Sequence, residues 1–303
     1  MGDFPAFKRW CEWNGKYRDD MREYLKGGLW CGKYAAKRLV GSPDIYDPNI
    51  RGKDASINFI TCHDGFTLYD LYCITRSTTR PTGWGQYGWR HDNRATGTAG
   101  AEGRNQRSRG SSSKKADDQE CLRDAPYKQR TPMFLAGDEF CNTQFGNNNP
   151  YCQDNEISWL DWGLLKKNQD IYQFFRYMIH FRKKHPAIHG LCQPATCGLM
   201  DVSLHGVRPF EGDFGEDAKV IAAMFAGFDS KRKKDDIVYI LINAYWEAMT
   251  VTLPTLPGDM KWSIAANTGE EGVGYHEEPV PLMQDEVLAG ERSVMVLVGG
   301  HYE

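Results

Sequence analysis

The sequence predicts an α/β region followed by an all-β region, and three observations carry this prediction. The stretch SINFI at 56–60 has the β-branched and aromatic residues of a buried strand, and a helix is expected soon after it. Residues 163–187 repeat apolar side chains at helical spacing and end beside Pro186, where a helix stops. Beyond residue 188 this periodicity gives way to short β-rich runs separated by turn residues. That pattern is typical of an antiparallel β-sandwich.

Two short helices are predicted before the strand at 56–60, and a second apolar strand is predicted well after it. YRDDMREYLKG at 17–27 reads as an amphipathic helix that ends at glycine, and AAKRLVG at 35–41 reads as a shorter helical piece. PMFLAG at 132–137 is an apolar run of strand length that ends in Gly137. These elements complete the expected α/β region.

The expected strands of the all-β region are short runs rich in Val, Ile, Leu and aromatic residues. Turn residues lie between them, as in FDSKRKKDD at 228–236. The runs are VSLHGV at 202–207, KVIAAMFAGF at 219–228, DIVYILINAY at 236–245, MTVTLPTL at 249–256, KWSIAAN at 261–267 and SVMVLVG at 293–299.

Composition excludes several classes of protein. The 303 residues include 37 basic and 40 acidic side chains, so the charge gives no reason to expect nucleic acid or an anionic membrane as a partner. No apolar run reaches the length of a membrane span, and MGDFPAFKRW at the start lacks the apolar core of a signal peptide. The 9 cysteines are scattered without a metal-binding spacing, which predicts reduced thiols in a cytoplasmic protein without a bound metal.

A histidine and an aspartate follow the strand at 56–60, where that strand is expected to end. Side chains at the C-terminal ends of barrel strands face the active site, so His63 and Asp64 are candidates for substrate binding and charge stabilisation. Gly65 then allows a turn, and Thr67 can cap the following helix. The alternative is a turn with an Asx cap and a surface histidine.

Two adjacent carboxylates, Asp138 and Glu139, follow the run at 132–137 in the same way. Paired carboxylates are suited to acid–base chemistry, and the alternative is that they orient neighbouring loops through hydrogen bonds. The loop GNNNPYCQDN at 146–155 leaves a similar choice open. Its amide side chains can bind sugar hydroxyls, or they can shape the loop itself.

The interval 73–130 does not have the composition of a folded segment. It carries 12 basic and 6 acidic residues, and Ile74 and Leu122 are its only Ile, Leu, Val or Met residues. Such a composition cannot bury a core. Read with synonymous codons and a one-base slip, 109–130 becomes a basic amphipathic helix that runs in register into TPMFLAGDEF. We therefore expect this interval to be largely an out-of-frame reading, with a disordered linker or basic arm as the alternative.

Five motifs together identify a family. INFITCHDGFTLYDL, TPMFLAGDEF, GNNNPYCQDN, ISWLDW and WNGKYRDD resemble the isoamylase and glycogen-debranching branch of the α-amylase family of glycoside hydrolases. The resemblance covers 1–72 and 131–303. It implies that residues 1–187 are the C-terminal part of a catalytic (β/α)8 barrel and that residues 188–303 are an antiparallel β-sandwich domain.

The resemblance also implies an activity and assigns roles within it. Members of this branch hydrolyse α-1,6 branch linkages of glycogen or limit dextrin by a retaining mechanism, without a cofactor. By resemblance, Asp64 is the carboxylate that stabilises the transition state, and His63 binds the sugar next to the cleaved bond. The Asp138–Glu139 pair is not catalytic in this family. The sequence contains no Asp-rich loop that requires calcium.

In the family, the nucleophilic Asp and the general-acid Glu belong to strands upstream of WNGKYRDD. We therefore expect this chain to lack them, and to be inactive and poorly folded alone. A non-catalytic α-glucan-binding remnant or pseudogene product is the alternative, and a related transferase is a third possibility. The sequence does not indicate an oligomeric state.

Overall fold

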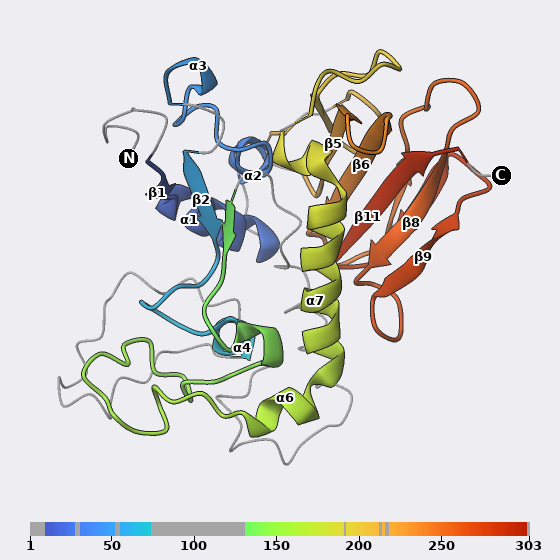
Figure 1. Cartoon of the computed structure of the whole chain (residues 1–303). Coiled ribbons are helices and arrows are strands. Elements are labelled where there is room, and N and C mark those ends of the chain that lie inside the picture. Colours follow the sequence, from blue (N-terminus) through green and yellow to red (C-terminus); the bar gives the residue numbers. More distant parts are fainter. Residues whose placement is uncertain are drawn as a thin grey trace. The chain divides into compact units, whose positions relative to one another are not determined.

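The computed structural model describes residues 10–27, 31–51, 55–73, 131–190, 192–211, 214–215 and 218–301 (Figure 1). The chain forms two compact units. The first unit comprises Met1–Asn58, Pro126–Pro132 and Tyr177–Glu303, and the second comprises Phe59–Ala125 and Met133–Arg176. Apart from Cys73, the interval expected to be out of frame lies outside the described residues, so that expectation stays a prediction.

A small sheet in the order β1-β2-β3 begins the architecture. Strand β1 (Glu12–Trp13) pairs in parallel with β2 (Ser56–Phe59), with Glu12 opposite Ser56 and Trp13 opposite Ile57. The predicted strand at 56–60 is therefore confirmed. Strand β3 (Thr131–Met133) is shorter than the predicted run at 132–137. It ends early because Gly137 adopts a φ of 98° and the chain turns there, with the Asp138 amide donating to the Leu135 carbonyl.

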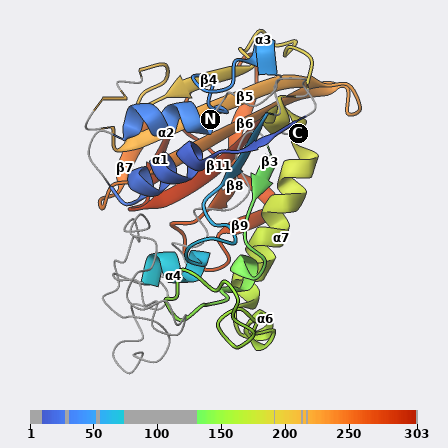
Figure 2. The same cartoon turned by 90° about the vertical axis from the view of Figure 1, so that its left-hand side faces the viewer.

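Helices α1 (Gly15–Leu25) and α2 (Gly32–Leu39) confirm the two predicted N-terminal helices. They pack together, and α2 also contacts β5 (Val220–Asp229) within the first unit (Figure 2). The face of α1 that is buried carries apolar side chains one turn apart, as the helical spacing predicted: Tyr17, Met21, Tyr24 and Leu25.

Asn14 joins three parts of the first unit. Its side-chain oxygen accepts the Tyr17 amide at 2.9 Å and so caps α1, and its side-chain nitrogen donates to the hydroxyls of Ser42 and Ser56 at 2.9 and 3.0 Å. Asn14 is fully buried. This one amide therefore fixes the start of α1 against the beginning of β2.

Replacing Asn14 by Ala is expected to lower the free energy of unfolding of the protein encoded by the complete reading frame by about 1–2 kcal/mol. The substitution removes a helix cap and leaves buried hydroxyls without their donor. Urea denaturation followed by circular dichroism measures the change. The exposed Asn49 provides the control, since Asn49→Ala removes no buried partner. Equal effects of the two substitutions would contradict the role of Asn14.

Two helices, α6 (Gly163–Lys167) and α7 (Gln169–Lys184), replace the single helix predicted over 163–187. They are separated at Asn168, whose side chain donates to the Phe140 carbonyl at 2.8 Å. That long-range bond holds Asn168 out of helical geometry. The shorter elements of this part of the chain are α3 (Pro48–Arg51), α4 (Leu68–Cys73), η3 (Asp138–Phe140) and η4 (Pro186–His189).

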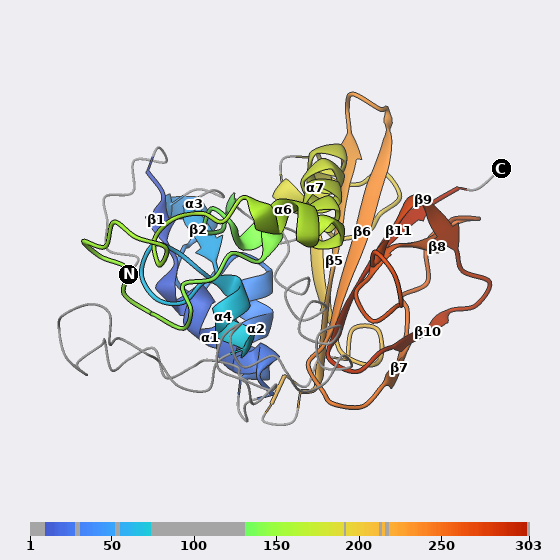
Figure 3. The same cartoon turned by 90° about the horizontal axis from the view of Figure 1, so that it is seen from below.

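The C-terminal part of the first unit is an antiparallel six-stranded sheet in the order β4-β5-β6-β11-β8-β9, with a two-stranded sheet of β7 and β10 (Figure 3). The strands after β5 are β6 (Lys234–Asn243), β7 (Met249–Thr252), β8 (Lys261–Asn267), β9 (Tyr275–Pro281), β10 (Glu286–Ala289) and β11 (Ser293–Gly300), and β4 (Val202–His205) precedes them. All six predicted β-runs form strands. Two further strands, β9 and β10, were not predicted.

One apolar cluster lies between the two sheets. It joins Tyr239 and Leu241 of β6 and Leu297 of β11 to Val251 of β7 and Val287 of β10. Tyr239, Leu241, Leu297 and Val251 are completely buried. Because successive side chains of a strand point to opposite faces of the sheet, every second residue of these strands faces this cluster. Burial of these apolar side chains stabilises the antiparallel part of the molecule. The predicted domain boundary between residues 187 and 188 stays a prediction.

Candidate functional site

His63 and Asp64 lie where the sequence placed them, in the turn between β2 and α4. His63 Nε2 is 3.4 Å from Asp64 Oδ2. Their side chains are 67% and 80% exposed, so a ligand can reach both. As predicted, the Asp70 amide donates to the Thr67 hydroxyl at 3.2 Å, which caps α4. The pair is thus an accessible imidazole and carboxylate at the end of a strand.

A buried carboxylate, Asp138, holds both ends of this turn. Its Oδ2 accepts hydrogen bonds from the Thr61 hydroxyl at 2.5 Å and the Leu135 amide at 3.1 Å, and its Oδ1 accepts the Leu68 amide at 2.9 Å. Burial raises the pKa of Asp138 to about 7, although the same donors act in the opposite direction. Neighbouring Glu139 accepts the Gly137 amide at 2.8 Å. These contacts support the loop-orienting alternative for the pair.

The loop that follows Asp138 forms hydrogen bonds to Gly65, in the middle of the turn between β2 and α4. Gln144 Nε2 donates to the Gly65 carbonyl at 3.0 Å, and the Gly65 amide donates to the Asn148 carbonyl at 3.1 Å. The start of this loop is fixed in turn by Asp70, which accepts the Thr143 hydroxyl and the Gln144 amide. Burial raises the pKa of Asp70. Both backbone polar groups of Gly65, the residue after Asp64, are therefore engaged.

The amide side chains of 146–155 mostly shape the loop itself. Asn147 Oδ1 accepts the Asn149 amide at 2.8 Å, Asn149 Oδ1 accepts the Tyr151 amide at 3.3 Å, and Gln153 Nε2 donates to the Asn149 carbonyl at 3.0 Å. These are the local bonds that Asn and Gln make in turns. They favour the loop-shaping alternative over direct contact with sugar hydroxyls.

Two exposed aromatic side chains, Tyr151 and Trp159, lie in and just after this loop. The sequence interpretation did not single them out. Tyr151 is 74% exposed. Trp159 is 57% exposed while its indole nitrogen donates to Asp154 Oδ1 at 2.8 Å, which fixes the ring orientation. Aromatic faces presented on an ordered loop can stack against apolar faces of sugar rings. The motif ISWLDW at 157–162 contains Trp159 and could have indicated an aromatic contact with the sugar. Whether that ring is exposed depends on the tertiary structure, so the sequence did not show it.

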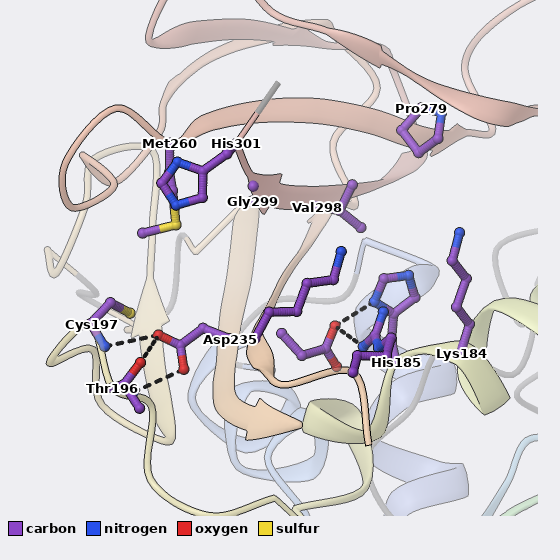
Figure 4. A pocket seen from close by; sticks show the side chains of 14 residues that line it. Lys184, His185, Thr196, Cys197, Asp235, Met260, Pro279, Val298, Gly299 and His301 are labelled. Carbon is purple, nitrogen blue, oxygen red and sulfur yellow. Dashed lines mark hydrogen bonds and ion pairs between the residues drawn. The ribbon is translucent and has the colours of Figure 1, made fainter. Parts of the chain in front are cut away.

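A cavity of about 560 Å³ lies in the first unit, and its lining does not include His63 or Asp64 (Figure 4). Its carboxylates are already satisfied: Asp236 binds His185 Nδ1 at 2.6 Å and the Ala187 amide at 3.0 Å, and Asp235 binds Thr196 and Cys197. Its lining contains no Trp, Tyr or Phe side chain. The paired carboxylates therefore join the end of α7 and the 196–197 turn to β6, which is a structural role.

Within the described ranges, no group of three or more His, Cys, Asp or Glu side chains is arranged to hold a metal ion. No described helix is long and apolar enough to cross a membrane. Seven cysteines in the described part of the chain have free thiols. Three of them are buried: Cys31, Cys62 and Cys141.

Curated proteins match the chain, and three of them show the range of similarity. The "Glycogen operon protein GlgX homolog" of Mycobacterium tuberculosis is 40% identical over 197 residues, which are 61% of this chain and 25% of that protein. "Isoamylase 1, chloroplastic" of Oryza sativa is 32% identical over 270 residues, which are 89% of this chain and 32% of the relative. The "Glycogen debranching enzyme" of Serratia proteamaculans is 39% identical over 189 residues, or 62% of this chain and 28% of the relative. The chain thus spans about a quarter to a third of the length of these relatives.

Solved structures agree on the fold. A pullulanase from Bacillus acidopullulyticus superposes with a TM-score of 0.63 at 16% identity, covering 95% of this chain and 30% of the pullulanase. No protein-family model matches the chain. The chain is therefore a relative of the isoamylase and glycogen-debranching branch of the α-amylase family, similar to the C-terminal part of those enzymes.

Proposed function

We propose that this chain is part of an α-1,6-glucan debranching hydrolase that cleaves branch linkages of glycogen or limit dextrin. The observation that carries the proposal is the exposed His63–Asp64 pair at the end of β2, within a turn held by buried hydrogen bonds. The printed names of the curated relatives support the substrate class. In the proposed architecture, residues 1–187 complete a (β/α)8 barrel and residues 188–303 form the β-sandwich domain.

The proposed chemistry is retaining glycoside hydrolysis. A nucleophilic carboxylate and a protonated acid, about 5 Å apart, flank the scissile bond, and the transition state resembles an oxocarbenium ion. Asp64 is the further carboxylate, whose hydrogen bonds to the sugar hydroxyls tighten as positive charge develops. His63 donates a hydrogen bond to the same sugar. The nucleophile and the acid are assigned to no residue of this chain.

No cofactor enters this reaction. A reducing compartment such as the cytoplasm is part of the proposal, and the free thiols of the described cysteines support it.

The test uses the protein encoded by the complete reading frame that contains this chain. Incubation with a glycogen limit dextrin is expected to release linear oligosaccharides and new reducing ends, which size-resolved chromatography detects. Longer chains without new reducing ends would favour the transferase. Binding without any cleavage would favour a non-catalytic α-glucan-binding protein, and would contradict the proposal.

The nucleotide sequence of the locus tests the frame hypothesis for 73–130. Two compensating single-base insertions or deletions are expected near the ends of that interval. An uninterrupted frame without them would contradict the hypothesis.

A further inference from the structure

Asp138 lies 74 residues after Asp64 in sequence, yet it contacts both stems of the turn that carries Asp64. The turn leaves β2 at Ile60 and enters α4 at Leu68. Thr61 at its start donates its hydroxyl to Asp138 Oδ2 at 2.5 Å, and Leu68 at its end donates its amide to Oδ1 at 2.9 Å. One carboxylate therefore sets the distance between the two stems.

The same carboxylate is tied to its own segment. Asp138 Oδ2 also accepts the Leu135 amide at 3.1 Å, and Asp138 is only 1% exposed. Three donors thus converge on two oxygens in a site closed to water. Asparagine could not replace Asp138, because its side-chain NH₂ group is a donor. That group would face one of the three donors that now bind the two carboxylate oxygens. The site requires an acceptor at both positions.

A second contact restrains the turn at the residue next to Asp64. Gly65 has a φ of 93°, which side-chain-bearing residues rarely adopt, and its carbonyl and amide are bound by Gln144 Nε2 and the Asn148 carbonyl. Within the described residues, the exposed Asp64 carboxylate lies 3.4 Å from Nε2 of the likewise exposed His63 and is held by no buried side chain. Its direction is therefore set mainly by the backbone on either side of it.

We propose that Asp138 is a positioning residue, which fixes the turn between β2 and α4 so that Asp64 points toward the sugar in the transition state. This inference rests on the proposed function. Catalytic groups must be held close to their productive geometry, and a misplacement of about 1 Å can cost roughly 100-fold in rate. Asp138 supplies that restraint from a buried position and does not touch the substrate.

The test compares Asp138→Asn and the milder Thr61→Val in the enzyme encoded by the complete reading frame. Both are expected to lower kcat on limit dextrin by about 10- to 100-fold, with KM changed by less than about threefold. Thr268→Val is the matched control, because Thr268 is also buried and its hydroxyl accepts the Val294 amide, in the first unit. That control is expected to lower stability while kcat per folded enzyme stays the same.

Combination with Asp64→Asn separates positioning from a general structural role. If Asp138 acts through Asp64, the double variant is no slower than Asp64→Asn alone. Rate losses that multiply would overturn the inference, as would an unchanged kcat in both Asp138→Asn and Thr61→Val.

Hydrogen exchange of the protein encoded by the complete reading frame gives a readout that does not depend on activity. Asp138→Asn is expected to speed exchange in peptides covering 59–68 and to leave peptides covering 237–243 unchanged. If the wild-type enzyme cleaves no α-1,6 linkage, the proposed function fails and this measurement alone decides the positioning. Unchanged exchange over 59–68 would then overturn it.

Discussion

Replacing Asp64 by Asn is expected to lower kcat on limit dextrin by at least about 100-fold in the enzyme that contains this chain. The substitution keeps the size of the side chain and removes its charge. A group that stabilises charge developing in the transition state contributes about 10²- to 10³-fold when it is removed alone. Since Asp64 is 80% exposed and, among the described residues, is held by no buried side chain, folding should not change. Initial rates of reducing-end release measure the effect, and the thermal midpoint checks the fold.

Two further substitutions provide a control and a smaller expected loss of kcat for comparison with Asp64→Asn. Asp170→Asn removes an exposed carboxylate at the start of α7 in the same unit and is expected to leave kcat unchanged. His63→Ala removes one hydrogen bond to the sugar and is expected to lower kcat about tenfold. An Asp64→Asn enzyme with more than half of the wild-type kcat would show that Asp64 is not the stabilising carboxylate.

Replacing Asp236 by Ala is expected to destabilise the protein encoded by the complete reading frame by about 3–5 kcal/mol. Asp236 is 3% exposed and binds His185 at 2.6 Å, the Ala187 amide at 3.0 Å and, in an ion pair, Arg232 at 3.0 Å. Removing this buried carboxylate leaves its partners without their acceptor. Urea denaturation of the protein encoded by the complete reading frame measures the loss.

Asp259 offers the matched control for this prediction. It binds His301 at 2.7 Å, but its side chain is 87% exposed, so Asp259→Ala should change stability little. Similar losses for Asp236→Ala and Asp259→Ala would contradict the importance of burial.

The contribution of Asp236 should also depend on pH in a defined direction. Burial alone would raise the pKa of Asp236, but the hydrogen bond and charge of His185, the Ala187 amide and the charge of Arg232 together hold that pKa below its usual value. A carboxyl whose pKa is lowered on folding stabilises the protein above its unfolded pKa of about 3.9, and the stabilisation is lost as pH falls through the folded pKa. The difference in unfolding free energy between wild type and Asp236→Asn should therefore shrink below about pH 4.

Local patterns were sufficient for most of the elements. The run DIVYILINAY predicted a strand because its continuous β-branched and aromatic residues describe a buried strand without reference to any partner, and β6 matches it. The amphipathic spacing in 17–27 predicted α1 for the same reason. His63 and Asp64 were located correctly because the end of a strand and a glycine turn are both local features. Their proposed role came from the resemblance.

Elements whose conformation depends on a distant partner were missed or misjudged. Strand β9 contains Pro279 and Pro281 and is mostly exposed, so it lacks the strand pattern and forms through its pairing with β8. Asn168 divides the predicted helix because it bonds to Phe140, 28 residues away. The exposure of Tyr151 and Trp159 was missed for a similar reason, because local sequence does not indicate which aromatic side chains remain outside the core.

The sequence by itself determined most of the strands and helices, the place of His63 and Asp64 and the family that this chain resembles. Only the tertiary structure decided what holds Asp64. Asp138 appeared as one of two adjacent carboxylates with either a chemical or a structural role. Its bonds to Thr61 and Leu68 span 77 and 70 residues. Hydrogen bonds of that kind have no local signature, because they depend on two distant segments being brought together by the packing of the core.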